Sequence, residues 1–240
     1  MIIDDRQYRV TLAAFVSVGK LRLIFQDPMS SLNPRKKVRD LIGAGLDIHH
    51  KYGSKEERSS LIGEYLMKVG LSPEQGDRYP AQFSGGQRQR VGIARALIMQ
   101  PKLIIADECI AALDASIQAQ VVNLLKKLCK ESGTSMLFIS HDLSMVHYIS
   151  DKIGVLHLGY LLETGSSDAV FSSPVHPYTR NLLASVPRPD PIMQSHVSEG
   201  YDPVSSGIIY ENGNWHSCES DPTHKVWCTD EEWKKWGEGK

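Results

Sequence analysis

The sequence predicts an α/β fold in which a mostly parallel β-sheet is covered by helices. Between residues 83 and 160, short apolar segments of strand length alternate with amphipathic segments of helical period, which is the order that builds parallel sheets. Residues 36–82 instead repeat their apolar positions at helical spacing throughout. The chain has 240 residues, of which 41% are hydrophobic, so it can bury one core or two small ones.

Composition excludes several broad classes of protein. The formal net charge of −1 argues against a large nucleic-acid-binding surface. No apolar run approaches the roughly 20 residues that span a bilayer, and the first residues lack the pattern of a signal peptide. Four cysteines do not make a disulfide scaffold. These features are typical of a cytoplasmic α/β protein.

The first half of the chain begins with two predicted strands and continues with helices. The first twenty residues alternate weakly and predict one strand, at Tyr8, Val10 and Leu12. Residues 21–25 predict a second strand. In the helical region Ser54 is expected to cap a helix whose Glu57 completes a capping box, and Gly70 is expected to end that helix.

The second half predicts two buried strands, each followed by a helix, and then a hairpin. In chain order these are 103–106, 116–129, 136–139, 143–149 and a hairpin of 153–158 with 160–164. Beyond Pro187 the chain becomes polar and rich in Pro, Gly and Asn, with four tryptophans near its end. We interpret that stretch as an appended tail and not as core.

A serine and two glycines open the helix that follows Phe83. Ser84, Gly85, Gly86 and Gln87 form a ready anion site, because glycines let backbone N–H groups approach a phosphate and the helix dipole favours negative charge there. The alternative is that the same residues are a simple N-cap and turn.

Polar side chains follow three of the predicted strands directly. Asp107 and Glu108 end the strand 103–106, where Asp107 suits a magnesium ion and Glu108 suits the polarisation of an attacking water. His141 follows the next strand, and Gln26 ends the strand 21–25. Since the carboxyl ends of parallel strands share one edge, these groups are expected at one ligand site. The alternatives are a solvated Asp-Glu pair and a packed loop histidine.

These motifs, in this order, resemble those of the ATP-binding-cassette (ABC) ATPases. The matching segments are Gln26-Asp27-Pro28, Ser84-Gly85-Gly86-Gln87, Asp107-Glu108, Ala112-Leu113-Asp114 and Ser140-His141-Asp142. The resemblance implies a P-loop-NTPase-like nucleotide-binding domain that uses ATP and Mg²⁺. It assigns catalytic roles to Glu108, His141 and Gln26, nucleotide contacts to Ser84, Gly85, Gly86, Gln87 and Asp114, and the magnesium ion to Asp107 and Gln26.

Three further segments resemble the ATP-binding subunits of oligopeptide and dipeptide importers: residues 25–35, 116–120 and 174–179. This resemblance implies a peripheral ATPase on the cytoplasmic side of the cell membrane that couples ATP hydrolysis to peptide uptake. Its implied partners are a homologous or identical ATPase in a head-to-tail dimer, two transmembrane permease subunits and, indirectly, a peptide-binding protein. No nucleic-acid partner is expected. The expected domains are a divergent segment 1–20, an ABC ATPase domain 21–165 with a helical subdomain 36–82, and a C-terminal extension 166–240.

The sequence departs from the family pattern in its first residues. The phosphate loop Gly-x-x-x-x-Gly-Lys-[Ser/Thr] is not found, and Ser17-Val18-Gly19-Lys20 lacks both the first glycine and the final hydroxyl. We therefore expect an N-terminally shortened ABC domain that does not bind ATP measurably when isolated. Micromolar binding with magnesium would refute that expectation. The second hypothesis is a non-catalytic scaffold that supplies its signature residues, Ser84 to Gln87, to an intact partner. A third, an ABC protein of translation or repair, is disfavoured by the importer-like segments.

Two cysteine-containing features are also unusual for the family. Cys109 stands where proline usually follows the glutamate that corresponds to Glu108 in the family. We expect it to be a buried, inert thiol. Near the end of the chain, four side chains of metal-binding type fall in a spacing that matches no metal motif. They are His216, Cys218, His224 and Cys228. We expect this segment to pack against the body of the protein or a subunit and not to bind zinc.

Overall fold

The computed structural model describes residues 20–27, 31–185, 208 and 210–237. The chain divides into two compact units, which meet in sequence between His141 and Asp142. Each unit contains its own β-sheet. The strand predicted around Tyr8 and the fragment ending in Gly19 lie outside the described residues.

The first unit is built on the parallel sheet that the sequence predicts. Strands β1 (Leu21–Ile24), β2 (Leu103–Asp107) and β3 (Ser135–Ile139) lie in the order β1-β2-β3, and both pairings are parallel. β2 is central and pairs with β3 along its whole length. Its Ile104 and Ala106 are wholly buried, as expected of a parallel strand that is covered by helices.

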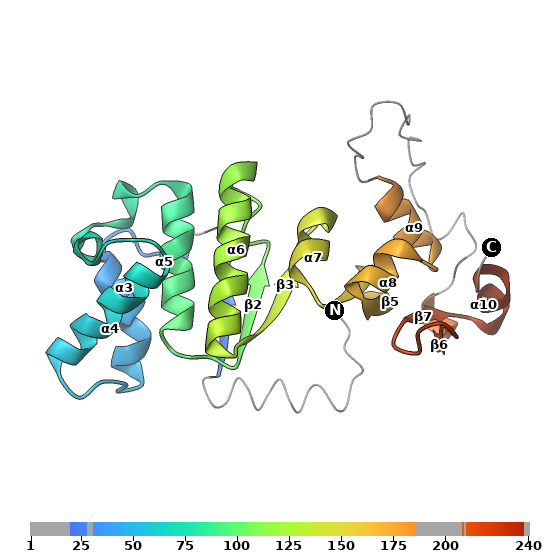
Figure 1. Ribbon diagram of the computed structural model, residues 1–240, viewed down its shortest axis with the longest axis horizontal. Helices are drawn as coiled ribbons and strands as arrows, with labels where there is room; N and C mark the ends of the chain where they lie inside the picture. The colour runs from blue at the N-terminus through green and yellow to red at the C-terminus, as the bar shows by residue number, and fades with distance from the viewer. Residues whose placement is uncertain (1–19, 28–30, 186–207, 209, 238–240) are drawn as a thin grey trace. The chain divides into compact units, whose positions relative to one another are not determined.

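Helices α5 (Gly85–Leu97) and α6 (Ala115–Ser132) stand side by side against this sheet (Figure 1). The side chain of Asp114 caps the start of α6, and Gly133 ends it in the left-handed conformation that glycine adopts without steric cost. The strand–helix alternation read from the sequence is therefore confirmed, with boundaries that differ by a few residues.

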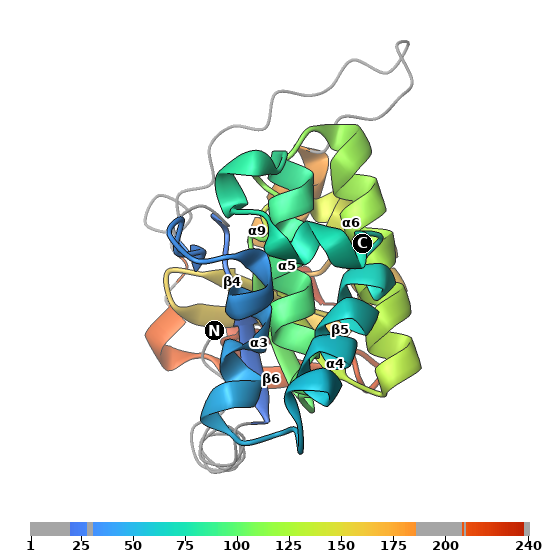
Figure 2. The same ribbon diagram turned by 90° about the vertical axis from the view of Figure 1, so that its left-hand side faces the viewer.

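The predicted helical region is also confirmed, as α3 (Val38–Ile48), α4 (Lys55–Lys68) and the 3₁₀ turns η1 (Pro73–Asp77) and η2 (Pro80–Gln82). Figure 2 shows α3 and α4 beside α5.

The capping box expected at the start of α4 is wrong in one half. Ser54 does accept from the Glu57 backbone N–H, but the Glu57 carboxylate accepts from Gly53 N at 2.6 Å instead of Ser54 N. The carboxylate reaches one residue too far for the reciprocal bond.

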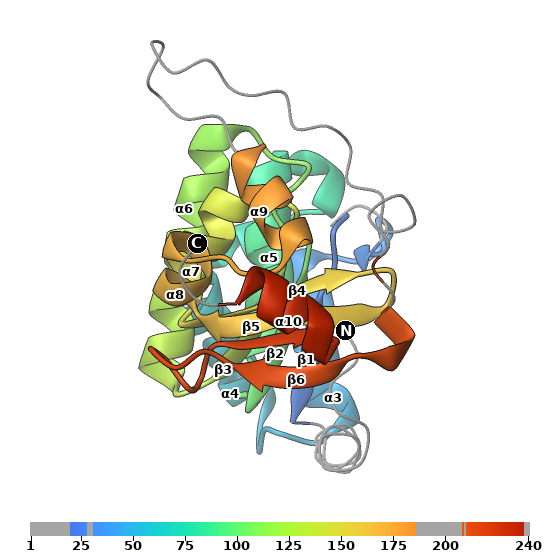
Figure 3. The same ribbon diagram turned by 90° about the vertical axis from the view of Figure 1, so that its right-hand side faces the viewer.

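The second unit begins with α7 (Leu143–Ile149) and the predicted hairpin, β4 (Lys152–His157) and β5 (Tyr160–Ser166). The two residues between these strands have φ values of 46° and 87°, as a two-residue hairpin turn of left-handed backbone requires. Strands β6 (Asn214–Ser217) and β7 (Lys225–Cys228) complete an antiparallel sheet of order β4-β5-β7-β6 (Figure 3).

The interpretation of the chain beyond Pro187 as an appended tail is wrong for its described part. β7 pairs with β5, and Val226 is wholly buried. Helix α10 (Asp230–Trp236) packs its tryptophans on an apolar cluster that includes Val175 of the loop before α9. The remaining elements of the unit are α8 (Ser167–Ser172), α9 (Pro177–Ala184) and the turn η3 (Tyr210–Asn212).

The boundary between the units precedes the β4–β5 hairpin, which the sequence analysis grouped with residues 21–165. Among the described residues, none of the helices has the length and apolar character needed to cross a membrane.

Candidate functional site

Three of the predicted site residues meet at the carboxyl edge of the parallel sheet. The Gln26 side chain donates from Nε2 to Glu108 Oε2 at 2.6 Å, and His141 Nδ1 lies 3.2 Å from Glu108 Oε1. Gln26 follows β1, Glu108 follows β2 and His141 follows β3. Residues that are 82 and 33 positions apart in sequence are thus joined through one carboxylate.

The backbone holds Glu108 in an unusual conformation. Its φ is 43°, in the left-handed region that costs about 1 kcal/mol or more for a residue with a Cβ. Its N–H donates to the Ile139 carbonyl at 2.9 Å, which continues the contact with β3 one residue beyond the ladder. Strained backbone of this kind clusters at functional sites. The sequence gives no signal for it.

The cluster is open to solvent. The Glu108 side chain is 32% exposed and the His141 side chain 73% exposed, while Gln26 and Asp107 are exposed residues. A carboxylate oxygen has more than one lone pair, so Glu108 can accept a further hydrogen bond while it contacts Gln26 and His141. The arrangement can therefore hold a water or a polar ligand beside Glu108.

Ser84 to Gln87 open α5 with a reciprocal capping box. Ser84 Oγ accepts from Gln87 N, and Gln87 Oε1 accepts from Ser84 N at 3.0 Å. The N-cap alternative from the sequence analysis is thus present in the structure, and the role of these residues toward a phosphate stays a prediction. Gly86 has a packing reason to be glycine, because a Cβ there would lie 2.6 Å from Ile117 Cγ2.

Asp114 lies at the start of α6, the helix that carries Ile117. Its carboxylate accepts from Ser116 Oγ at 2.7 Å and from Ile117 N at 3.1 Å. These bonds, the one from Ser116 first, lower the pKa of Asp114. The contact of Gly86 with Ile117 places the start of α5 against the start of α6. Sequence reasoning missed this contact, since neither residue type marks it.

Cys109 follows Glu108 and is buried, as expected. Burial raises the pKa of its thiol to about 12, so the sulfur stays protonated and a poor nucleophile.

The four candidate metal ligands of the second unit point to different surroundings. His224 Nε2 lies 2.7 Å from Glu163, and His216 Nε2 lies 3.3 Å from Asp230. The two cysteines are buried in the apolar cluster under α10. Within the described part of the chain, no group of three or more His, Cys, Asp or Glu side chains is arranged to hold a metal ion.

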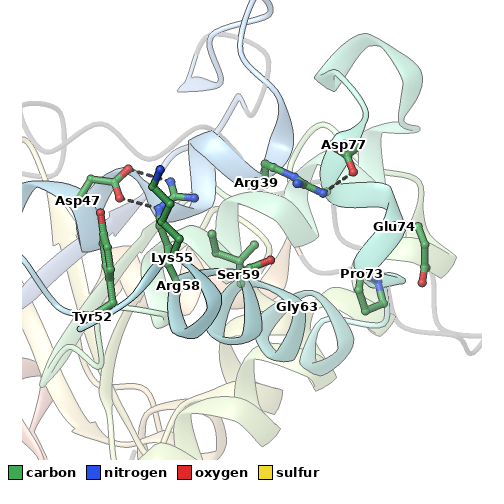
Figure 4. Close-up of a pocket in the computed structure, with 12 residues that line it drawn as sticks. Arg39, Asp47, Tyr52, Lys55, Arg58, Ser59, Gly63, Pro73, Glu74 and Asp77 are labelled. Atoms are coloured by element: carbon green, nitrogen blue, oxygen red, sulfur yellow. Dashed lines mark hydrogen bonds and ion pairs between the residues drawn. The ribbon is translucent and has the colours of Figure 1, made fainter.

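A separate groove of about 710 Å³ lies in the helical part of the first unit (Figure 4). Charged pairs line it: Arg58 donates two hydrogen bonds to Asp47, at 2.6 and 2.8 Å, and Arg39 pairs with Asp77. None of the predicted site residues is part of its lining.

Comparison with known proteins assigns the class. The family described as ABC transporter matches residues 14–111. A solved structure, cbiO1 from Clostridium perfringens, part of the ABC transporter complex cbiONQ, superposes with a TM-score of 0.58 at 25% identity and covers 71% of this chain and 65% of that one. The parallel sheet and the Gln26–Glu108–His141 cluster thus occur in a chain of the ABC ATPase class.

The subfamily follows from the second family match and from curated relatives. The family described as oligopeptide/dipeptide transporter, C-terminal region, matches residues 162–203. The oligopeptide transport ATP-binding proteins OppF of Streptococcus mutans and Bacillus subtilis are each 52% identical over 216 residues, covering 90% of this chain and 69% and 70% of theirs. The dipeptide transport ATP-binding protein DppF of Lactococcus lactis is 48% identical, covering 89% of this chain and 68% of the relative. The chain belongs to the oligopeptide/dipeptide family of ABC transporter ATP-binding proteins.

Proposed function

We propose that this chain is the ATP-binding subunit of an oligopeptide or dipeptide importer and couples ATP hydrolysis to peptide uptake. The observation that carries the proposal is the convergence of Gln26, Glu108 and His141 in a chain whose relatives are peptide transport ATP-binding proteins. The partners would be a second ATPase subunit, membrane permease subunits and, through them, a peptide-binding protein, with the chain on the cytoplasmic side of the membrane.

The donor set at the sheet edge fits a magnesium ion. Asp107 offers an exposed carboxylate beside Glu108, and Gln26 keeps its amide oxygen because its nitrogen makes the bond to Glu108. Carboxylate and amide oxygens are ligands that Mg²⁺ accepts. A bound magnesium ion would offset the negative charge of the phosphate groups. Glu108 would orient and polarise the attacking water, and His141 would hydrogen-bond near the terminal phosphate.

Ser84 to Gln87 and Asp114 would act on the other side of an ATPase pair. The backbone N–H groups at the start of α5 and the helix dipole favour a phosphate there. Packing of Gly86 against Ile117 couples this surface to the helix that Asp114 caps.

The test is ATP turnover by an importer assembled from this chain, a homologous ATPase and the membrane subunits. Ser84→Arg should lower turnover by about 100-fold or more, because a bulky cation replaces the small residue at the phosphate-facing helix start. Ser54→Arg is the matched control, since Ser54 caps α4 with the same type of bond and is no part of the site. Unchanged turnover in Ser84→Arg would exclude a signature role.

Glu108→Gln separates the proposal from the scaffold alternative. If this chain contributes its own hydrolytic site, the loss of the carboxylate should lower turnover by about 10²- to 10⁴-fold. Glu131→Gln, which changes an exposed helical carboxylate, is the control. Turnover that depends on Ser84 but not on Glu108 would favour the alternative, a subunit that only supplies signature residues to its partner.

A further inference from the structure

A partly buried arginine links the helix that begins at Ser84 to Ser31, which follows Gln26 in the chain. Arg95 lies in the last turn of α5 and donates from Nη1 to the Ser31 carbonyl at 2.6 Å. Burial lowers the pKa of its guanidinium. Burying a cation against a neutral carbonyl costs desolvation energy, and among the described residues no acidic side chain is paired with Arg95 to offset it. Such a residue needs a reason beyond stability.

The position of Ser31 in the chain explains the bond from Arg95. It lies five residues after Gln26 and next to Leu32, which is only 2% exposed. Just beyond, a turn is closed by a bond from Lys36 N to the Asn33 carbonyl. The bond from Arg95 and the burial of Leu32 therefore fix the chain at a point five residues after Gln26.

The same helix supplies a matched comparison. Arg90 also lies on α5 and also donates to a backbone carbonyl, that of Val69, at 2.9 Å. It bonds in addition to Gln120. Val69 is the C-cap of α4, in the helical part of the unit, and lies far from Gln26 in the sequence. Both arginines donate to a backbone carbonyl, but Arg95 bonds to the chain close to Gln26, whereas Arg90 bonds to the end of α4.

We propose that Arg95 is a positioning residue that anchors the chain at Ser31, five residues after Gln26, and so keeps the Gln26 amide against Glu108. Its importance for ATP turnover rests on the function proposed above, whereas its effect on the Gln26–Glu108 bond does not. Because α5 also begins at Ser84, one helix connects the partner-facing residues with the glutamine of the hydrolytic cluster.

The first experiment reads the Gln26–Glu108 bond directly in the full chain. In ¹H–¹⁵N spectra the Gln26 side-chain amide signal is identified as the one lost in Gln26→Ala, and Glu108→Ala gives its position without the bond. Arg95→Met should move this signal toward the Glu108→Ala position, and Arg90→Met should leave it in place. Arg95→Lys keeps a cation but loses the guanidinium that reaches Ser31 through Nη1, so it should move the signal in the same direction by a smaller amount, and it covers the case in which Arg95→Met folds poorly. A signal unmoved in both Arg95 variants overturns the proposal.

The second experiment is a double-mutant cycle on ATP turnover in the assembled importer. Arg95→Met should lower kcat by about 10- to 100-fold, the range for a hydrogen bond to a charged group, with little change in KM. In a Gln26→Ala background the same change should cost almost nothing further, since both changes act through one side chain. Equal losses in the two backgrounds overturn the positioning role. An assembly whose turnover is indifferent to Gln26 overturns the proposed function instead, and the amide signal still decides the case for Arg95.

Discussion

Among the described residues, each unit of this protein contains one glutamate–histidine ion pair, and the two pairs differ in exposure and in their further partners. Glu108 and His141 lie 3.2 Å apart with side-chain exposures of 32% and 73%. Glu163 and His224 lie 2.7 Å apart with exposures of 0% and 3%. The Glu108 carboxylate contacts Gln26 and His141, and its side chain remains partly exposed to solvent. The glutamate–histidine pair is therefore accessible to a ligand in the first unit and inaccessible in the second.

The buried pair organises backbone. Glu163 accepts from Val175 N at 2.8 Å and from His176 N at 3.0 Å, in addition to His224 Nε2. These bonds fix the residues that precede α9, and β7 carries His224 into place by pairing with β5. The buried carboxylate holds its surroundings in place through three donors, whereas the exposed one, on strained backbone, is accessible to a ligand.

The largest expected difference is in stability. Glu163→Ala should lower the free energy of unfolding of the second unit by about 3–5 kcal/mol, because it leaves His224 and two buried N–H groups without an acceptor. Glu108→Ala should cost the first unit about 1 kcal/mol or less, as exposed pairs do. Tryptophan fluorescence in denaturant follows the second unit alone, since all four tryptophans lie between residues 215 and 236. Circular dichroism reports on both units, so the part of its transition that the tryptophan signal does not show belongs to the first unit.

Similar losses for the two alanine variants would break the comparison. They would mean that Glu163 is no more important to its unit than an exposed carboxylate is. Thr223→Ala is a suitable control in the second unit, because it removes an exposed hydroxyl bond to Asp221 close to His224.

The second expected effect concerns pH and a neighbour of Glu163. His176 is wholly buried, and its Nδ1 accepts from Tyr178 N at 3.0 Å, so the fold requires a neutral ring. Burial lowers its pKa to about 4; Glu163 acts in the opposite direction, and His157 and Arg180 add to the lowering. An unfolded histidine has a pKa of about 6.5. As pH falls from about 6.5 to 4, His176 takes up a proton in the unfolded chain but not in the folded one. The free energy of unfolding therefore falls, by up to about 3 kcal/mol.

His176→Asn isolates this titration. Asparagine keeps a side-chain acceptor for the N-cap of α9 but has no proton to gain. The free energy of unfolding, read by tryptophan fluorescence, should therefore fall less steeply between pH 6.5 and 4.5 in the variant than in the parent chain. Parallel pH profiles would show that His176 is not the group that responds.

The two pairs also differ in how far the sequence predicts them. Gln26, Glu108 and His141 each follow a recognisable strand, so the geometry of parallel sheets is enough to expect them at one edge. Glu163 and His224 are 61 residues apart, and their contact depends on the pairing of β5 with β7. Residues 186–209 are polar and rich in proline, which hides the strands beyond them and led to the wrong interpretation of a tail.

Contacts made by small or long side chains escape the sequence for another reason. The packing of Gly86 on Ile117 and the bond from Arg95 to Ser31 depend on how α5 lies against its neighbours. Helical periodicity predicts that α5 exists and which face is apolar, but it does not predict which residue of another element a side chain meets.

The smallest expected effect concerns the backbone strain at Glu108, which distinguishes this residue from the buried Glu163. Glu108→Ala and Glu108→Gly both remove the carboxylate, and with it the contacts to Gln26 and His141. Only the alanine variant keeps a Cβ at a φ of 43°. Glycine adopts that conformation freely, which outweighs the extra freedom it gives the unfolded chain. The free energy of unfolding of the glycine variant, measured by circular dichroism in denaturant, should therefore be about 1 kcal/mol higher than that of the alanine variant. Glu131→Gly against Glu131→Ala, in ordinary right-handed backbone in the last turn of α6, should give the opposite order. If glycine is the less stable choice at both positions, then the backbone at Glu108 stores no strain, and its carboxylate is held in place by its two side-chain contacts alone.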